Sequence, residues 1–368
     1  MTRPFSHIAA SGCITPAGDA RQTYDMLLSG QRSLRMQPVF GPHGDNVPLS
    51  TFESIESTLP PKWLTRLETL VAHIPSRPWG APGYPVVITS SNFGIGHILA
   101  YHDSKVDEHL QYAQAHTSVE KICGHFGWQH SASILSHACV SADVGMLHAS
   151  RLLHKGAAHE VLVFSFDFLS PFVTGGFNSL KILNGSYPAP YANKENGSIG
   201  LGDGAAFVVL SKEPARFRIS HQNLANEMFH MTANQPDGSG FRNALSRIAA
   251  EIGATKVWVK GHGTGTLEAG KLEAQAVASV FPDAPLVSWK GGIGHTLGSC
   301  GLVEINLAIE AMRHGQVPGT VGTTGPTWEA NVKTGPFSCA EFQGAVLSSN
   351  AFGGAHASSL LTDTHRMD

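Results

Sequence analysis

Short apolar runs alternate with segments of helical periodicity along most of this chain. The runs at 85–90, 161–165 and 205–210 are each bounded by glycine or polar turn residues, a pattern typical of buried strands. Apolar side chains recur at helical spacing in three further segments: 143–153, 273–280 and 302–312. The pattern predicts an α/β protein in which strands and helices alternate.

The same alternation begins again after residue 212. New strands are expected at 256–259, 286–288 and 344–348, and no long Gly/Ser-rich linker separates them from the first part of the chain. We therefore expect two similar α/β halves, 1–212 and 213–368, that meet near residue 212. Surface excursions are expected in two segments: 37–48 and 183–200.

Composition and charge argue against several classes of protein. The chain has 368 residues, 42% of them hydrophobic, and can bury a large core. A net charge of −3 gives no reason to expect nucleic acid or an anionic membrane as partner. The five cysteines are scattered and lack metal-type spacing, so neither a disulfide framework nor a metal site is expected. Because no long apolar stretch occurs, we expect a cytoplasmic protein without a membrane span.

Cys139 has the context of a nucleophile. It ends an apolar run and directly precedes the helical stretch 143–153, where the first-turn N–H groups of a helix favour the reactive thiolate. His262 and His295 lie far downstream, each in a glycine-rich turn. Together they predict a Cys-His-His acyl-transfer site. The remaining cysteines have no such context and are interpreted as small buried side chains: Cys13, Cys123, Cys300 and Cys339.

These residues belong to a longer series of short motifs. In order along the chain, the motifs are 12–18 (GCITPAG), Ala138-Cys139, 169–172 (LSPF), 202–205 (GDGA), 230–232 (HMT), 262–266 (HGTGT), Lys290 with His295, 301–304 (GLVE) and 350–354 (NAFGG). With them, the chain resembles the β-ketoacyl-acyl carrier protein synthases of the thiolase-like superfamily over nearly its full length. The resemblance implies a duplicated αβαβα fold of five layers that assembles as a dimer.

The resemblance also implies a decarboxylative Claisen condensation. Cys139 would accept an acyl group from a carrier thioester, with the backbone N–H groups of Cys139 and Phe352 as the oxyanion hole. His262 and His295 would stabilise the enolate that forms when malonyl-acyl carrier protein loses CO₂. Attack of this carbanion on the acyl-Cys139 would give 3-oxoacyl-acyl carrier protein.

Further roles come from the same resemblance. Lys290 and Glu304 would order the two histidines, and Phe352 would gate the acyl pocket. The pantetheine arm would be bound by three hydroxyl side chains: Thr264, Thr266 and Thr232. No metal or redox cofactor is implied, because the substrates are carried on the phosphopantetheine of acyl carrier protein. The partners would be that carrier and a second subunit, either an identical copy or another ketosynthase-like chain.

Several positions depart from the family pattern. Residues 191–197 replace an aromatic-Asp and Arg-Asp-Gly pattern, and Gly270 stands at a common acidic position although Glu273 is retained. Ala351 replaces the usual glycine before the gating aromatic, and His356 replaces the usual asparagine of the last motif. These changes favour a divergent branch, in fatty-acid-like, polyene or polyketide biosynthesis.

The departures also leave an alternative open, namely a chain-length-factor-like subunit that shapes a partner's tunnel without condensing anything. The intact Cys139, His262 and His295 favour the enzyme, because a chain-length factor normally replaces the cysteine. A thiolase or an initiating synthase is disfavoured, because it would place a second cysteine or an asparagine where this chain has a histidine.

Overall fold

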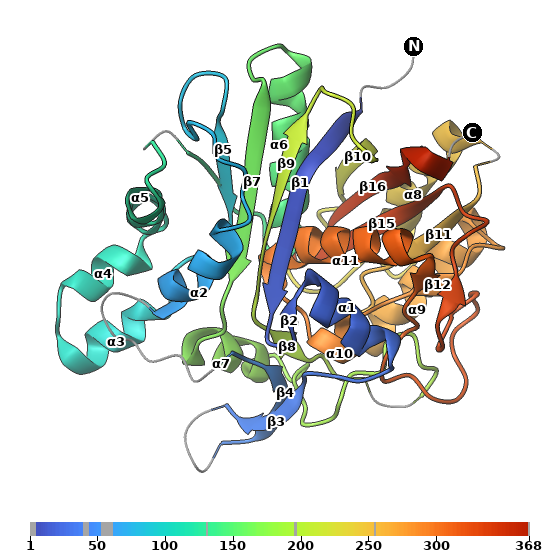
Figure 1. Cartoon of the computed structure of the whole chain (residues 1–368). Coiled ribbons are helices and arrows are strands. Elements are labelled where there is room, and N and C mark those ends of the chain that lie inside the picture. The colour runs from blue at the N-terminus through green and yellow to red at the C-terminus, as the bar shows by residue number, and fades with distance from the viewer. Residues whose placement is uncertain are drawn as a thin grey trace.

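Two sets of strands with the same internal order form the frame of the molecule (Figure 1). The computed structural model describes residues 5–39, 44–52, 62–129, 132–194, 197–253 and 255–366. Within these residues the first set runs β6 (Ser133–Leu135), β5 (Val86–Thr89), β7 (Glu160–Asp167), β9 (Gly204–Ser211) and β1 (Ser6–Thr15). The second runs β12 (Leu286–Val287), β11 (Val257–Lys260), β15 (Gly344–Ala351), β16 (Ala355–Asp363) and β10 (Phe217–Asn226).

Strand directions repeat between the two sets as well. In each set, taken in the order given above, the first three strands are parallel to one another. The fourth strand, β9 or β16, is antiparallel to both of its neighbours. β1 and β10 pair antiparallel over a short stretch that includes Ser6 with Ile219, which joins the two sets. The same order and the same directions on both sides are the arrangement expected of a duplicated fold.

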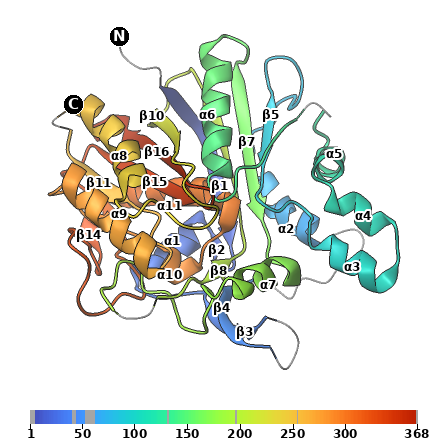
Figure 2. The same ribbon diagram turned by 180° about the vertical axis from the view of Figure 1, so that it is seen from behind.

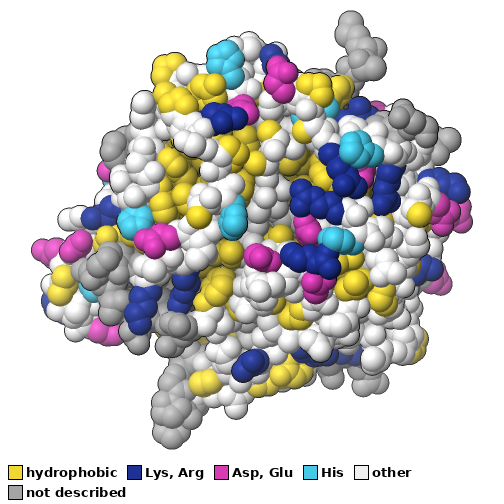
Figure 3. Space-filling model, in the orientation of Figure 1, with side chains coloured by type: hydrophobic (Ala, Val, Ile, Leu, Met, Phe, Trp, Pro, Cys, Tyr) yellow, Lys and Arg dark blue, Asp and Glu magenta, His cyan; other side chains and the backbone are white. Residues whose placement is uncertain are grey.

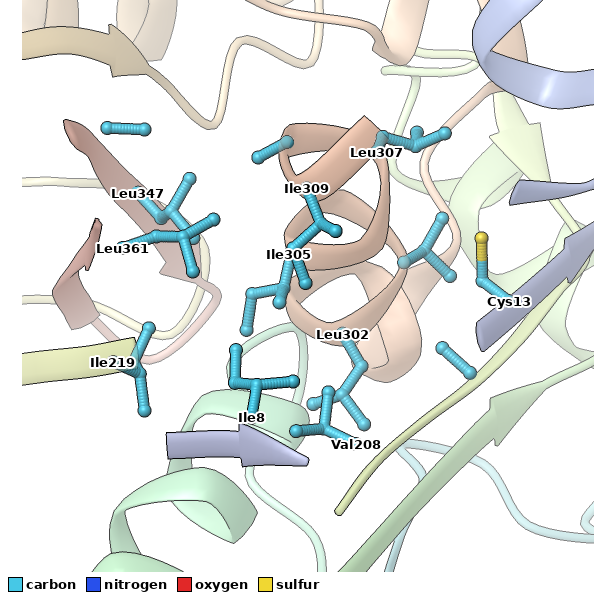
Figure 4. Close-up of a cluster of buried hydrophobic side chains, with 14 of the residues drawn as sticks. Ile8, Cys13, Val208, Ile219, Leu302, Ile305, Leu307, Ile309, Leu347 and Leu361 are labelled. Atoms are coloured by element: carbon cyan, nitrogen blue, oxygen red, sulfur yellow. The ribbon is translucent and has the colours of Figure 1, made fainter. Parts of the chain in front are cut away.

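Two central helices form the middle layer. α6 (Ser141–His154) and α11 (Cys300–His314) each pack against strands of both sets. Figure 4 shows α11 side chains, among them Leu302 and Ile305, lying between the strand residues Val208 and Leu347. Almost every residue of α11 is buried, which is why its sequence is apolar around nearly the whole helix.

The outer layers complete the five-layer αβαβα fold. α2 (Lys62–Val71) and α5 (Ala115–Phe126) cover the outer face of the first set, and α8 (Ser239–Ile252) and α9 (Leu267–Val280) cover that of the second (Figures 1 and 2). Alternate residues of β7, such as Val163 and Phe164, face the middle layer and the outer layer in turn. Because both faces are covered, the strand is apolar at nearly every position, as the sequence pattern predicted.

The remaining elements are shorter and lie mainly at the edges. They are α1 (Ala20–Leu28), α3 (His97–Ser104), α4 (Glu108–Ala113), α7 (Pro171–Ser179), α10 (Lys290–Ile293), β2 (Gly18–Asp19), β3 (Arg35–Pro38), β4 (Asn46–Ser50), β8 (Leu201–Gly202), β13 (Gln316–Val317) and β14 (Phe337–Ser338), with 3₁₀ turns at Leu297–Ser299 and Thr364–Arg366. Acidic and basic side chains are interspersed on the face shown in Figure 3. None of the helices within the described ranges is long and apolar enough to cross a bilayer.

One sequence expectation needs correction, and two others are tested only in part. The segment 183–200 is not a surface excursion, because much of it is buried, including Tyr191, and it contributes to the cavity beside Cys139. The segment 37–48 includes parts of β3 and β4, and its residues 40–43 lie outside the described residues. The division near 212 falls between β9 and β10, and the two halves as separate domains stay a prediction.

Candidate active site

A tight turn presents Cys139 at the start of α6. Ala138, directly before it, has φ of 46°, a left-handed conformation that non-glycine residues rarely adopt. Ser141 stabilises the turn: its Oγ accepts a hydrogen bond from the His137 N–H (2.8 Å) and donates one to the Ala138 carbonyl (2.6 Å). The strained turn therefore fixes the position of the thiol between β6 and the helix.

The Cys139 thiol is more strongly buried than its sequence context suggested. Its residue is 8% exposed, and burial raises the pKa of the thiol to about 12, while the charge of Lys290 acts in the opposite direction. The backbone N–H groups of Phe352 and of Cys139 itself also favour the thiolate. The expected stabilisation by the helix N-terminus is thus outweighed by desolvation, and the free protein holds a neutral thiol at pH 7.

His262 and His295 lie edge to face beside the same cavity as Cys139. Their ring centroids are 4.9 Å apart with an interplanar angle of 87°. Burial, followed by the charge of Lys290, holds the pKa of both imidazoles well below the usual value, so both rings are neutral at pH 7. Among the described residues, both ring nitrogens of His295 and the Nδ1 atom of His262 lack a hydrogen-bond partner.

The cavity has a volume of about 470 Å³ and extends from Cys139 to the surface near Lys181. Thr264, Thr266 and Thr232 line it, and the first two have their hydroxyls 3.1 Å apart. Phe352 also lines the cavity, is 37% exposed, and stacks on Phe177 with ring centroids 5.9 Å apart. The structure thus brings these predicted residues together, while their roles stay predictions.

Behind the histidines, Glu304 contacts two buried lysines instead of one. Lys290 Nζ donates to Glu304 Oε1 at 2.6 Å, and Lys260 Nζ donates to Oε2. Lys260 also donates to the Ser348 carbonyl at 3.3 Å. Asp143 lies close enough for its charge to interact with Lys260, and burial raises the pKa of this carboxyl to about 6. The group thus combines two cations with two acids.

Lys260 was not predicted from the sequence, although a signal was present. A lysine at the end of the apolar strand β11, two residues before His262, is unusual because a charged side chain is rarely buried without a partner. The partner, Glu304, could not be paired with it from the sequence. The two residues are far apart along the chain, and only the packing of α11 against the second strand set brings them together.

Glu273 holds the turn of His262 in place. Its carboxylate accepts hydrogen bonds from the backbone N–H groups of His262 (2.6 Å) and Gly263 (2.8 Å) and from the Tyr191 hydroxyl (2.9 Å). The Asn350 amide donates to it as well, at 3.2 Å. The sequence indicated only that Glu273 was retained, whereas the structure shows that it anchors the His262 turn and that the altered 191–197 loop supplies one of its donors.

Iodoacetamide is expected to modify Cys139 before any other cysteine. Burial raises the pKa of Cys13, Cys123 and Cys300 too. Access through the cavity distinguishes Cys139 from Cys123 and Cys300. Cys13 also lines a cavity, but only at Cys139 do the charge of Lys290 and two backbone N–H groups favour the thiolate. Because its pKa of about 12 leaves the thiolate a minor species, the rate should rise about tenfold for each pH unit between about pH 7 and 9. Peptide mapping by mass spectrometry measures both; equal labelling of all five cysteines would contradict the assignment.

Comparison with known proteins shows what the chain is similar to. Residues 217–324 match the family model "Beta-ketoacyl synthase, C-terminal domain". The chain is 26% identical over 237 residues to 3-oxoacyl-[acyl-carrier-protein] synthase 2 of Coxiella burnetii. The chain is thus similar to β-ketoacyl synthases, and residues 217–324 match a model of that family. It is also 28% identical over 268 residues to the tetracenomycin polyketide synthase ketoacyl synthase alpha subunit of Streptomyces glaucescens.

These alignments are partial. They cover 59% and 65% of this chain, and 57% and 63% of the two relatives, so the chain spans about three fifths of the length of these curated relatives. What those whole proteins do is therefore not transferred to this chain by the alignment alone.

Solved structures show the same fold over the whole chain. A ketosynthase in complex with its chain length factor from Xenorhabdus doucetiae superimposes with a TM-score of 0.81, covering 98% of each chain at 20% identity. A type II polyketide synthase acyl-carrier protein complex with its ketosynthase gives 0.84, covering 99% of this chain and 100% of that one at 15% identity. Both likenesses confirm the thiolase-like fold of this chain.

Proposed function

We propose that this protein catalyses the decarboxylative condensation of an acyl group held on Cys139 with malonyl-acyl carrier protein. One observation carries the proposal: a cysteine and two neutral histidines with unpartnered ring nitrogens face one cavity. Buried polar atoms without partners are costly, and a substrate oxygen in the cavity would give the histidines their missing hydrogen bonds. The reaction also needs a free thiol, and Cys139 forms no disulfide.

In the first step, Cys139 Sγ attacks the carbonyl carbon of the acyl thioester. The carbon–sulfur bond to the carrier breaks, and the carrier thiol leaves with the proton that Cys139 gives up. The backbone N–H groups of Cys139 and Phe352 both favour negative charge on the sulfur, and in this proposal they also stabilise the oxyanion. The high pKa of Cys139 means that this proton has to be removed during the step.

In the second step, malonyl-acyl carrier protein loses CO₂. The bond between its carboxylate and its central carbon breaks, and the electron pair moves into an enolate whose oxygen carries the charge. Neutral His262 and His295 stabilise that oxygen by donating hydrogen bonds from their ring N–H groups. The carbon of the enolate then attacks the acyl-Cys139 carbonyl, and Cys139 leaves as the thiolate.

The residues around this centre have supporting roles. Lys290 and Lys260 place positive charge behind the two histidines, which helps to keep both rings neutral. Thr264, Thr266 and Thr232 offer hydroxyl groups to the amides of a pantetheine arm along the cavity. Phe352, stacked on Phe177, is placed to open or close the way to the acyl pocket.

A second candidate is a chain-length-factor-like role in a heterodimer. The departures at Gly270 and within 191–197 favour it, and a similar structure is that of a ketosynthase in complex with its chain length factor. In this role the chain would shape the tunnel of a separate synthase. The intact cysteine and histidines count against it, because a subunit that condenses nothing has no chemical need of them. Acyl carrier protein would be a partner in either role.

Transfer of an acyl group to Cys139 tests the first step. Incubation with acyl-acyl carrier protein should add the acyl mass to the peptide that contains Cys139, because this thiol lines the cavity and two backbone N–H groups favour its thiolate. Cys123→Ala, which removes a buried thiol of the outer layer, should leave the transfer unchanged. Finding no acyl mass on this peptide, or finding it on another cysteine, would overturn the proposed function.

A further inference from the structure

A series of polar contacts connects a cavity loop to the turn of His262. Glu227 Oε1 accepts from the Gln235 backbone N–H at 3.0 Å, and Glu227 Oε2 lies 3.4 Å from His356 Nε2. His356 Nδ1 is 2.6 Å from Asn350 Oδ1. The Asn350 amide contacts Glu273, which holds the His262 turn. The residues 227–238, which we call the 227–238 loop, also carry Thr232 of the cavity wall.

The direction of each hydrogen bond follows from the chemistry of the groups. Glu273 accepts from N–H and O–H groups and is therefore an ionised acceptor, so Asn350 must donate to it through Nδ2. This leaves Asn350 Oδ1 as an acceptor, and His356 Nδ1 must carry a proton to donate to it. A neutral His356 would then present a bare Nε2 lone pair to the Glu227 carboxylate.

Two bare acceptors would thus face each other in the interior. Neither His356 Nε2 nor Glu227 Oε2 has a conventional hydrogen-bond partner among the described residues. Both side chains are almost completely buried, at 1% and 4% exposure. Leaving both atoms unpaired is costly, whereas one proton placed between them would satisfy both at once.

We propose that the Glu227–His356 pair holds one buried proton, and that this proton ties the 227–238 loop to the turn of His262. The inference goes beyond the proposed function, because it concerns how the cavity wall is fixed whatever the reaction. His356 acts through Asn350 and Glu273 and is therefore a positioning residue. The proposal also gives a role to one of the departures from the family pattern, in which this position is usually asparagine.

The surroundings of His356 fit a shared proton. Glu227 faces it from the end of β10, Glu273 lies beyond Asn350 towards α9, and the neutral ring of His262 lies further along the same network. The ring of Phe241, which lies on α8, contacts the His356 ring in a T-shaped arrangement. Burial lowers the pKa of the His356 imidazole, an effect that the carboxylate of Glu227 opposes but does not cancel. Two carboxylates and no cation in this set favour retention of the proton by the pair.

The absence of a side chain at Gly240 leaves room for the contact between Glu227 and His356. A Cβ atom at Gly240 would collide with both Glu227 Oε2 and His356 Nε2. Any side chain there would push the pair apart, so α8 approaches it closely only because residue 240 is glycine. Gly240→Ala therefore separates the pair without changing either titratable group.

Loss of the proton is expected to release the loop. Glu227 anchors the loop through Gln235, while the loop contacts the Phe352 turn where the Gly353 N–H donates to the Met231 carbonyl at 2.7 Å. Without the proton, the carboxylate and the imidazole lone pair repel each other. Because the pair in the closed loop is proposed to hold this proton more tightly than the separated groups of the opened loop do, raising the pH favours opening.

Hydrogen exchange of the 227–238 loop at several pH values tests the proposal without any substrate. After correction for the intrinsic pH dependence of exchange, protection in the wild type should fall as the pH rises through the range in which the pair loses its proton, by up to about tenfold for each pH unit. Glu227→Gln should keep the loop protected at every pH, because its amide donates to neutral His356 and needs no shared proton. Glu227→Ala should leave the loop unprotected throughout.

Two further variants separate the proton from a general structural effect. Gly240→Ala should lower protection in the same loop, whereas Gly176→Ala, whose new Cβ meets open space, should not. Identical pH dependence in the wild type and in Glu227→Gln, or no dependence in the wild type, would overturn the proposal. Because no acyl transfer is measured, this outcome is independent of whether Cys139 condenses anything.

Discussion

Replacing Cys139 with glutamine is expected to reduce condensation by about a thousandfold or more while malonyl-acyl carrier protein is still decarboxylated. Among the described residues that line the cavity, no thiol other than Cys139 could hold the acyl group. The enolate-forming step depends on His262 and His295, which the change leaves in place. Product analysis by mass spectrometry, alongside measurement of released CO₂, separates the two steps.

The matching variants are His262→Ala and His295→Ala. Each should lose decarboxylation, because one of the two hydrogen-bond donors to the enolate oxygen is removed, while acyl transfer to Cys139 continues. If Cys139→Gln instead retains full condensation, the acyl group is not held on this residue. If all three variants lose both steps together, the separation of roles between the cysteine and the histidines is wrong.

Replacing Glu304 with leucine is expected to destabilise the fold by roughly 3–5 kcal/mol, the usual cost of removing one partner from a buried ion pair. Glu304 is the shared carboxylate of Lys260 and Lys290, and all three side chains are almost fully buried. Two buried cations would lose their direct counter-charge. Denaturant unfolding followed by fluorescence measures the change in the free energy of unfolding.

Two further variants test whether the loss of stability in Glu304→Leu comes from the burial of this charged group. Glu341→Gln, in an exposed pair with Lys256, should have little effect because solvent screens that pair. The triple change Lys260→Met, Lys290→Met and Glu304→Leu should recover stability relative to Glu304→Leu, because it removes all three charges together. It should not recover activity, since the histidines lose the charge behind them. Equal stability of Glu304→Leu and Glu341→Gln would contradict this account.

The layered architecture was largely predictable from the sequence, for an identifiable reason. α6 and α11 are buried between two sheets, so their apolar periodicity survives over their whole length, and β7 and β9 are apolar at nearly every position because both faces are covered. The segment 183–200 was misjudged because its prolines and glycines resemble those of a surface loop. In the structure they pack closely under the cavity; Pro188, for example, lies against Gly265.

The candidate site was predictable as a set of residues, but not as an electrostatic environment. Cys139, His262 and His295 stand in short recognisable motifs, and the structure brings them to one cavity. The high pKa of Cys139 follows from burial by surrounding segments, which a motif does not reveal. Lys260 and the Glu227–His356 pair could not be inferred, because each depends on a contact between distant parts of the chain.

The most direct test of the central claim is a condensation assay with acyl- and malonyl-acyl carrier proteins, run with this chain alone and with a candidate partner synthase. We predict that 3-oxoacyl-acyl carrier protein forms and that Cys139→Ala in this chain abolishes it. The contradicting result is a chain that is silent alone and whose pair keeps full activity after Cys139→Ala but loses it when the partner's own nucleophile is removed. That result would make this chain an architectural subunit.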